Sequence, residues 1–89
     1  MTKQDIFKKL TEKFPKSKIE IVDMTGQSNH FSLFILSDSF DNMPLIDRHK
    51  LIYSIFSEEL TTEIHALQIK AYTPSEWIRK NNNNTVNNS

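Results

Sequence analysis

The sequence predicts one small α+β domain in which helices cover one face of a three-stranded mixed sheet. Three observations predict this class. Apolar residues recur at helical spacing over residues 2–14 and 44–60. They occupy every second position of 18–21 and of 30–36, and a further alternating stretch follows the longer helical segment. With 89 residues, of which 37% are apolar, the chain can bury a single modest core. The expected order is helix, strand, strand, helix, strand, helix.

The first helix is expected to be amphipathic and to bury one apolar stripe. That stripe consists of Ile6, Phe7, Leu10 and Phe14. Thr2 and Asp5 stand at the N-cap and at the third helical position, which is the spacing of a capping box. Pro15 then marks the end of the helix, because the residue before a proline avoids helical backbone angles.

The next two segments are expected to pair as a hairpin. Residues 18–23 alternate isoleucines with charged neighbours, and residues 30–36 place every second side chain, beginning with Phe31, on one face. The polar stretch 25–29 between them contains Gly26, the only glycine of the chain, and predicts the connecting loop.

A longer helix and a third strand are expected to follow. Pro44 begins the helical segment, whose apolar stripe consists of Leu45, Ile52, Ile55, Phe56 and Leu60. The stretch 64–72 then alternates as a strand, with His65 at the start of its apolar face. Because the helix between the second and third strands is long enough for a crossover, the third strand is expected to run parallel to a neighbour.

The last helix has a strong start signal. Thr73 stands at the N-cap, Pro74 at the first helical position, and Glu76 at the position that completes a capping box. From this helix, Trp77 and Ile78 are expected to close the core.

The folded domain is expected to span residues 1–80. Residues 81–89 include six asparagines and one apolar residue, so we expect them to form a disordered tail. No apolar run is long enough to span a membrane, and the polar start lacks the pattern of a signal peptide. These features predict an intracellular protein, by default cytoplasmic, although they do not distinguish the cytoplasm from an organelle.

The charges are unevenly distributed, although eleven basic and eleven acidic residues cancel overall. Residues 1–18 carry six lysines and two acids, whereas residues 19–47 carry five acids and neither Lys nor Arg. A basic first helix can face an acidic partner or a nucleic-acid backbone. A run of charges is, however, more often a solvated helix face.

The sequence argues against an enzyme. It contains no Gly-x-Ser-x-Gly turn and no glycine-rich phosphate loop, and the adjacent Glu58 and Glu59 diverge on a helix. Cysteine is absent, which removes thiolate nucleophiles and self-contained thiolate metal sites. Any metal would therefore need imidazole, carboxylate or ligands from a partner.

The three histidines are the most informative reactive groups. The spacing of His30, His49 and His65 matches no compact metal motif. His49 lies between Arg48 and Lys50, which is typical of a surface position. His30 and His65 each begin a predicted strand, where loops meet solvent. Each can be a ligand or an ordinary half-buried polar side chain.

Four short stretches together resemble BolA-like proteins. They are Arg48-His-Lys-Leu-Ile-Tyr53, Glu58-Glu-Leu60, Ile64-His-Ala-Leu67 and Tyr72-Thr-Pro-Ser-Glu-Trp77. Ser28-Asn-His-Phe31 also resembles the entry to the second strand in that family, and Phe40 with Pro44 fits its next turn. The resemblance covers about residues 3–79 and implies a fold similar to the second class of KH domains.

The resemblance also implies a partner and a cofactor. It suggests a non-enzymatic adaptor that binds a monothiol glutaredoxin and shares a [2Fe-2S] cluster with that protein and its glutathione, for cluster trafficking or iron and redox sensing. The isolated chain would bind no cluster tightly. His65 matches the C-terminal ligand histidine of the family. The second ligand of the family lies in the loop between the first two strands. Here Gln27 stands about where a cysteine would lie, so either His30 substitutes or the chain supplies one ligand.

The alternative function is a DNA-binding transcriptional regulator with a KH-like fold. Its candidate phosphate contacts are Arg48, Lys50, Arg79 and Lys80. KH domains clamp nucleotides with a GXXG loop, which needs two glycines, and this chain has one. Zero net charge also predicts weak, salt-dependent binding. An interaction domain independent of redox state is a third possibility, and the sequence is compatible with a monomer or a homodimer.

Overall fold

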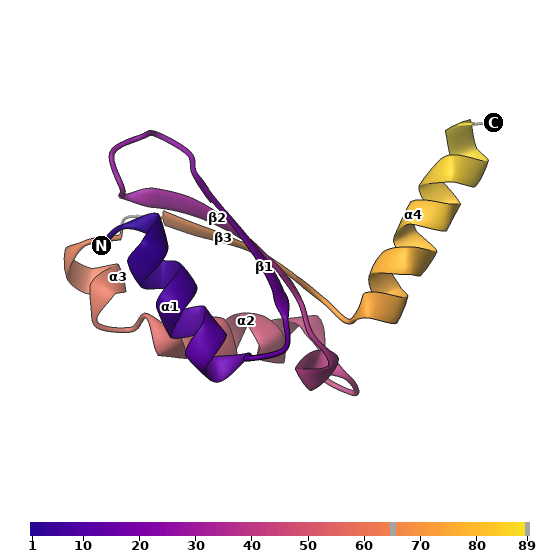
Figure 1. Ribbon diagram of the computed structural model, residues 1–89, viewed down its shortest axis with the longest axis horizontal. Coiled ribbons are helices and arrows are strands. Elements are labelled where there is room, and N and C mark those ends of the chain that lie inside the picture. The colour runs from indigo at the N-terminus through magenta and orange to yellow at the C-terminus, as the bar shows by residue number, and fades with distance from the viewer. Residues whose placement is uncertain (65, 89) are drawn as a thin grey trace.

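The computed structural model describes residues 1–64 and 66–88. Its helices and strands follow one another along the chain largely in the expected order (Figure 1). The elements are α1 (Lys3–Lys13), β1 (Lys18–Asp23), β2 (His30–Leu36), the 3₁₀ helix η1 (Asp38–Phe40), α2 (Leu45–Ile55), α3 (Glu59–Thr62), β3 (Ala66–Tyr72) and α4 (Pro74–Asn88). The Thr2–Asp5 capping box is present, as predicted. No helix among the described residues has the length and apolar character needed to cross a membrane.

The three strands form a mixed sheet in the order β1–β2–β3. β1 and β2 are the antiparallel strands of the predicted hairpin, and Asp23 lies opposite Phe31. β2 and β3 are parallel, and His30 lies opposite Ala66. The parallel pairing confirms the expected crossover, which α2 and α3 provide.

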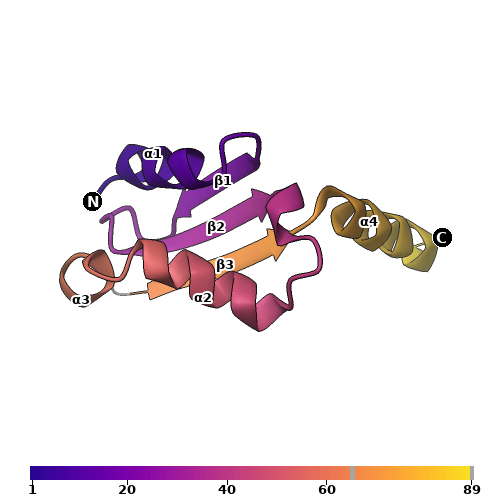
Figure 2. The ribbon, with the colours of Figure 1, turned by 90° about the horizontal axis from the view of Figure 1, so that it is seen from below.

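α1 and α2 cover the same face of the sheet, and the hydrophobic core lies beneath them (Figure 2). Side chains of β2 alternate as predicted, with Phe31, Leu33 and Ile35 buried on the helix-covered face. The helices contribute Ile6, Leu10 and Ile52, which are fully buried. We call the other side of the sheet the open face.

α4 packs on the open face and does not close the core. The Trp77 ring lies 4.7 Å from the ring of Phe34 and 5.6 Å from that of Tyr72, centroid to centroid. Alternation puts these two residues on the side opposite Phe31. Ile78 is 58% exposed. The prediction that Trp77 and Ile78 close the core is therefore wrong, because α4 leaves the end of β3 toward the open face and extends away from the body (Figure 1).

The second predicted helix is interrupted. α2 ends at Ile55 and α3 begins only at Glu59. At the interruption, the Phe56 N–H donates to the Tyr53 carbonyl oxygen at 3.1 Å, a tighter turn than that of an α-helix. The Phe56 ring is fully buried, and the Lys9 ammonium donates to both the Ile55 carbonyl and the Glu59 carboxylate. Contacts from α1, which the local pattern does not reveal, therefore stabilise the break.

Two side chains that the sequence assigned to apolar stripes are exposed. Phe7 is 47% exposed and Leu45 is 58% exposed. Phe7 lies about 100° around the helix from the fully buried Ile6, which puts it at the margin of the buried stripe. The helical spacing correctly identified the side of α1 that is buried, but it did not show how far around the helix the buried stripe extends.

The C-terminal segment also differs from the expectation of a disordered tail over residues 81–89. α4 continues through the asparagines to Asn88, and Ser89 lies outside the described residues. Thr73 caps the first turn, and each asparagine costs less than about 1 kcal/mol in a helix that has already been nucleated.

Candidate functional site

His30, one of the two predicted ligands, is the first residue of β2 and is half-buried. Its carbonyl oxygen accepts a hydrogen bond from the Met24 N–H at 2.8 Å, which closes the hairpin beside the loop. Alternation from the buried Phe31 directs the His30 side chain to the open face. The imidazole therefore lies on the side of the sheet that α1 and α2 leave uncovered.

The other predicted ligand, His65, lies outside the described residues. The next residue in the chain, Ala66, is the first residue of β3 and lies opposite His30. The Ala66 N–H donates to the Asn29 carbonyl oxygen at 3.2 Å. The structure thus brings the strand that follows His65 against the strand that begins with His30. We call this part of the sheet the histidine end.

The loop before His30 is held by one carboxylate that the sequence analysis did not identify. Asp23 accepts hydrogen bonds from the backbone N–H of Gly26 at 2.9 Å and of Ser28 at 3.0 Å. Gly26 and Ser28 have φ angles of 75° and 58°, in the left-handed region. An aspartate followed three residues later by glycine is a turn signal that could have revealed this role. Asp23 therefore fixes the path of the loop to His30.

Among the described residues, His30 is the candidate ligand that the structure places. Among residues 1–64 and 66–88, no group of three His, Cys, Asp or Glu side chains could hold a metal ion. Imidazole is nevertheless an established ligand of [2Fe-2S] iron, where histidines replace two of the four cysteines. His30 can therefore supply one imidazole ligand, and within residues 1–64 and 66–88 the chain offers no self-contained metal site.

Arg48, a predicted phosphate contact, is buried instead, with 4% exposure. Its two terminal nitrogens donate to the Glu76 carboxylate at 2.7 and 2.9 Å. Nε donates to the Met43 carbonyl at 2.7 Å, and Nη1 also donates to the Ala71 carbonyl at 3.0 Å. The prediction that Arg48 contacts nucleic acid is wrong, because a bidentate ion pair and two carbonyls occupy its guanidinium inside the fold.

The Arg48–Glu76 pair joins α2 to the start of α4. Glu76 also accepts the Thr73 N–H at 2.8 Å, and Thr73 Oγ1 accepts the Glu76 N–H, so the predicted capping box is confirmed. The Arg48 guanidinium, followed by the Thr73 N–H, lowers the pKa of Glu76 from 4.5 to about 2. The same pair raises the pKa of Arg48. Glu76 therefore keeps its charge far into the acid range.

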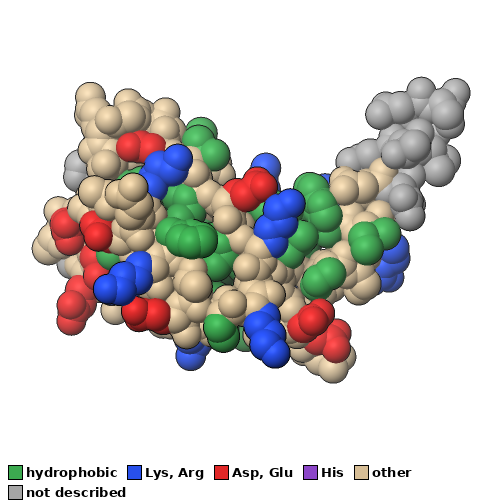
Figure 3. Space-filling view, in the orientation of Figure 1, with side chains coloured by type: hydrophobic (Ala, Val, Ile, Leu, Met, Phe, Trp, Pro, Cys, Tyr) green, Lys and Arg blue, Asp and Glu red, His purple; other side chains and the backbone are tan. Residues whose placement is uncertain are grey.

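The three other candidate cations, Lys50, Arg79 and Lys80, are exposed. Lys50 lies on α2, whereas Arg79 and Lys80 lie on α4, which extends away from the body (Figure 1). Lys80 Nζ donates to the Tyr72 hydroxyl at 3.2 Å and lies 5.2 Å from the centre of that ring. Acidic and basic side chains are interspersed over the face seen in Figure 3. The structure does not gather these cations into one patch.

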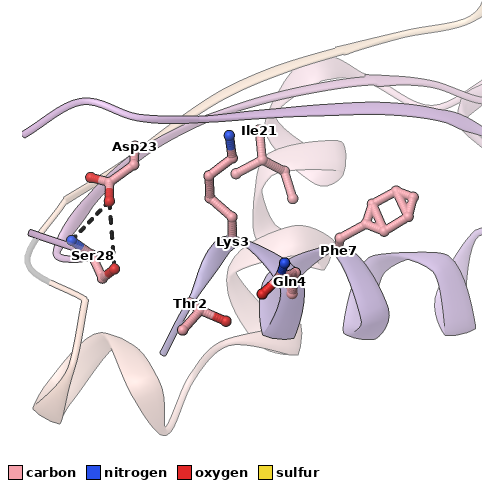
Figure 4. Close-up of a pocket in the computed structure, with 7 residues that line it drawn as sticks. All are labelled: Thr2, Lys3, Gln4, Phe7, Ile21, Asp23 and Ser28. Carbon is pink, nitrogen blue, oxygen red and sulfur yellow. Dashed lines mark hydrogen bonds between the residues drawn. The ribbon is translucent and has the colours of Figure 1, made fainter. Parts of the chain in front are cut away.

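A hollow of about 490 Å³ lies between the start of α1 and the β1–β2 hairpin (Figure 4). Its lining residues are Thr2, Lys3, Gln4, Phe7, Ile21, Asp23 and Ser28. A second hollow of about 420 Å³ shares Gln4 and Phe7 with it and extends to Lys8, Thr11 and Glu12. Helical spacing puts Phe7 in the buried stripe of the first helix, so the sequence pattern does not indicate these hollows.

Comparison with known proteins identifies the family. The family model described as BolA-like protein matches residues 10–76. The chain belongs to the BolA-like family. The part of this BolA-like chain that matches contains both candidate histidines and the Arg48–Glu76 pair, and it leaves Arg79 and Lys80 outside.

Relatives and solved structures agree with this assignment. The BolA-like chain is 36% identical over 84 residues to the DNA-binding transcriptional regulator BolA of Escherichia coli (strain K12), an alignment covering 86% of this chain and 80% of the relative. It is 34% identical over 79 residues to protein BOLA2 of Arabidopsis thaliana, covering 86% and 84%. The structure of BolA1 from Arabidopsis thaliana matches with a TM-score of 0.76 at 36% identity, covering 82% of this chain and 92% of that one. A bol-like protein from Babesia bovis gives a TM-score of 0.79 at 29% identity, covering 91% and 94%. These names describe no enzyme, and the shared fold is a small α+β domain.

Proposed function

We propose that this protein is a non-enzymatic adaptor that binds a monothiol glutaredoxin and shares a [2Fe-2S] cluster with it, for cluster trafficking or iron and redox sensing. The pairing of His30 with Ala66, the residue after His65, carries the proposal. It supports a site at the histidine end to which two segments far apart in the sequence contribute. The absence of cysteine is compatible with a cluster whose thiolate ligands come from the partner.

His65 would be the principal ligand from this chain, and His30 would be the second ligand if the chain supplies two. The glutaredoxin cysteine and glutathione would provide the others. The cluster would supply one-electron chemistry and transferable iron, at a higher potential than with thiolates alone. Imidazole ligates a metal only in its neutral form. Asp23 would keep His30 in place through its hydrogen bonds to the loop.

The test is a titration of a glutathione-ligated [2Fe-2S] glutaredoxin with this protein, followed by visible absorption and circular dichroism. We expect the wild type to change the spectrum and His65→Ala to lose that change. His49→Ala is the matched control, since His49 lies on α2 away from the strand starts, and it should behave like the wild type. The His30→Ala spectrum decides whether the chain supplies one ligand or two.

Two outcomes would contradict the proposed adaptor function. One is an unchanged spectrum together with no detectable complex. The other is a complex that forms equally well without a cluster and without His30 and His65, which would indicate a redox-independent interaction domain.

The second candidate function is DNA binding, which the names of relatives favour. BolA proteins of Escherichia coli, Haemophilus influenzae and Vibrio cholerae are named DNA-binding transcriptional regulators. With Arg48 buried, the candidate phosphate contacts of this chain reduce to Lys50, Arg79 and Lys80, together with the exposed lysines of α1.

Gel shift across salt concentrations tests this second function. Three phosphate contacts predict that affinity falls about forty-fold between about 50 and about 200 mM salt. Lys50→Ala should lower the slope of log affinity against log salt by about one. Sequence-selective, sub-micromolar binding at physiological salt would favour the regulator, whereas no binding at low salt would exclude it.

A further inference from the structure

The two outer edges of the sheet differ, and the β3 edge is occupied by side chains of α2. The Leu67 carbonyl oxygen accepts a hydrogen bond from the Tyr53 hydroxyl at 3.0 Å. The Ala71 carbonyl oxygen accepts one from the Arg48 guanidinium, also at 3.0 Å. An unpaired edge is a template for another strand, and side chains that take its carbonyls oppose such pairing.

The β1 edge is open. The Met24 N–H donates to the His30 carbonyl, so the hydrogen-bonded pairs of the hairpin involve the even-numbered residues of β1. The N–H and C=O groups of the odd-numbered residues, including Ile19 and Ile21, therefore point outward. Within residues 1–64 and 66–88, no hydrogen bond reaches these outward groups of Ile19 and Ile21. β1 can thus accept a further strand.

A groove accompanies this open edge. The two hollows described above lie between α1 and β1 or along α1, and they share Phe7 and Gln4. Phe7 is 47% exposed and Ile21 is half-buried, so the groove has an apolar floor. In strand addition, main-chain hydrogen bonds provide affinity, and pockets for alternate side chains provide specificity. The groove supplies such pockets directly beside the open edge.

The groove carries two lysines and two acids, and its lysines are the groups with which carboxylates of an occupant could pair. Lys3 and Lys8 lie on either side of Phe7 on α1, and Lys3 extends toward β1 (Figure 4). Neither lysine forms an ion pair with another described residue. Of the two acids that line the hollows, Asp23 already accepts two backbone N–H groups, and Glu12 lies about one turn beyond Lys8.

We propose that the β1 edge and the groove beside α1 bind an extended acidic segment of a partner protein by strand addition. On the face of the added strand that points toward α1, an apolar side chain would lie against Phe7 and carboxylates would lie near Lys3 and Lys8. This site goes beyond the proposed adaptor function, because it uses neither candidate histidine. A second copy of the chain fits less well, since symmetric β1 pairing would bring together two lysine-rich α1 surfaces.

The probe is a fluorescein-labelled peptide, acetyl-Glu-Thr-Phe-Thr-Glu-amide carrying the dye on a C-terminal linker. Alternate residues of an extended strand share a face, so its phenylalanine and both glutamates would point toward α1 together. Fluorescence anisotropy measures binding, and backbone amide exchange measures pairing. We expect the peptide to slow exchange at Ile19 and Ile21 and to leave Glu20, already paired with β2, unchanged.

Matched peptides and variants separate strand addition from simple charge attraction. N-methylation of the peptide amides that face β1 should abolish binding while charge and side chains stay the same. Phe7→Ala and Lys8→Glu should each raise the dissociation constant at least about tenfold, or about 1.4 kcal/mol. Lys16→Glu makes the same charge change at an exposed position outside both hollows, and its effect should stay below about twofold.

Equal binding of the N-methylated peptide, unchanged exchange at Ile21, or no binding of the probe would each overturn the proposal. A β1-mediated dimer in sedimentation experiments, dissociated by the peptide, would assign the edge to a second copy instead. The His65→Ala variant should bind the peptide like the wild type. The peptide-binding test can therefore succeed or fail independently of the test of the proposed adaptor function.

Discussion

Replacing Arg48 by alanine is expected to lower the free energy of unfolding by about 3–5 kcal/mol, because it removes a buried guanidinium together with its hydrogen bonds. The guanidinium is 4% exposed and holds the Glu76 carboxylate, the Met43 carbonyl and the Ala71 carbonyl. Its removal leaves these acceptors without their donor. It also removes one of the side chains that cover the β3 edge.

Urea unfolding followed by circular dichroism measures this change. A domain of this size has a total stability on the order of 5–10 kcal/mol, so Arg48→Ala could leave much of the chain unfolded. Glu76→Gln then provides a milder second variant, with an expected loss of about 1–2 kcal/mol, because the Glu76 side chain is 34% exposed. Lys50→Ala, an exposed neighbour on α2, should change stability by less than about 0.5 kcal/mol. A loss below about 1 kcal/mol for Arg48→Ala would contradict the role of the Arg48–Glu76 pair.

Acid should weaken the fold through the same pair. The folded-state pKa of Glu76 is about 2, below its usual 4.5, so the unfolded chain binds the proton more readily. The stabilisation is therefore fully present above about pH 5 and is lost as pH falls from about 4.5 through about 2. Hydrogen bonds likewise lower the pKa of Glu59, from Lys9, and of Asp5, from Thr2, which adds losses of the same sign.

The contribution of Glu76 is isolated by comparing the wild type with Glu76→Gln at each pH. Allowing for solvent screening of a side chain that is about one-third exposed, we expect the stability difference to shrink by about 1–2 kcal/mol between about pH 6 and about pH 2.5. Glu12→Gln, which removes an exposed carboxylate on α1, serves as the control and should follow the wild-type curve. A difference between the wild type and Glu76→Gln that is constant across this range would rule out the lowered pKa.

Local signals predicted most of the fold. Both capping boxes, at Thr2 and Thr73, were predictable because their partners lie within one helical turn. The alternation of β2 was equally clear, since one face of the strand is buried and the other is not. The crossover between β2 and β3 followed from the length of the intervening helical segment.

Long-range contacts account for what the sequence did not reveal. Arg48 stands in a run of three basic or imidazole residues that is typical of a surface, and its partner Glu76 is 28 residues away. The burial of Arg48 could not be read from either neighbourhood alone. Trp77 was expected in the core and packs on the open face instead, because a capping signal does not say which face of the sheet the helix will meet. At the candidate site, the start of β2 at His30 was predicted, whereas β3 begins at Ala66, two residues after the predicted start at residue 64. The register that sets His30 opposite Ala66 was not predicted.

The connectivity of the sheet bears on when the histidine end can assemble. β1 and β2 meet across a short loop, whereas β2 and β3 meet only after the whole α2–α3 crossover has closed. The entropy cost of closure grows with loop length, and non-local parallel pairing is slow. The contact between His30 and Ala66 is therefore expected among the last to form. The histidine end is therefore complete only in a molecule whose α2–α3 crossover has closed.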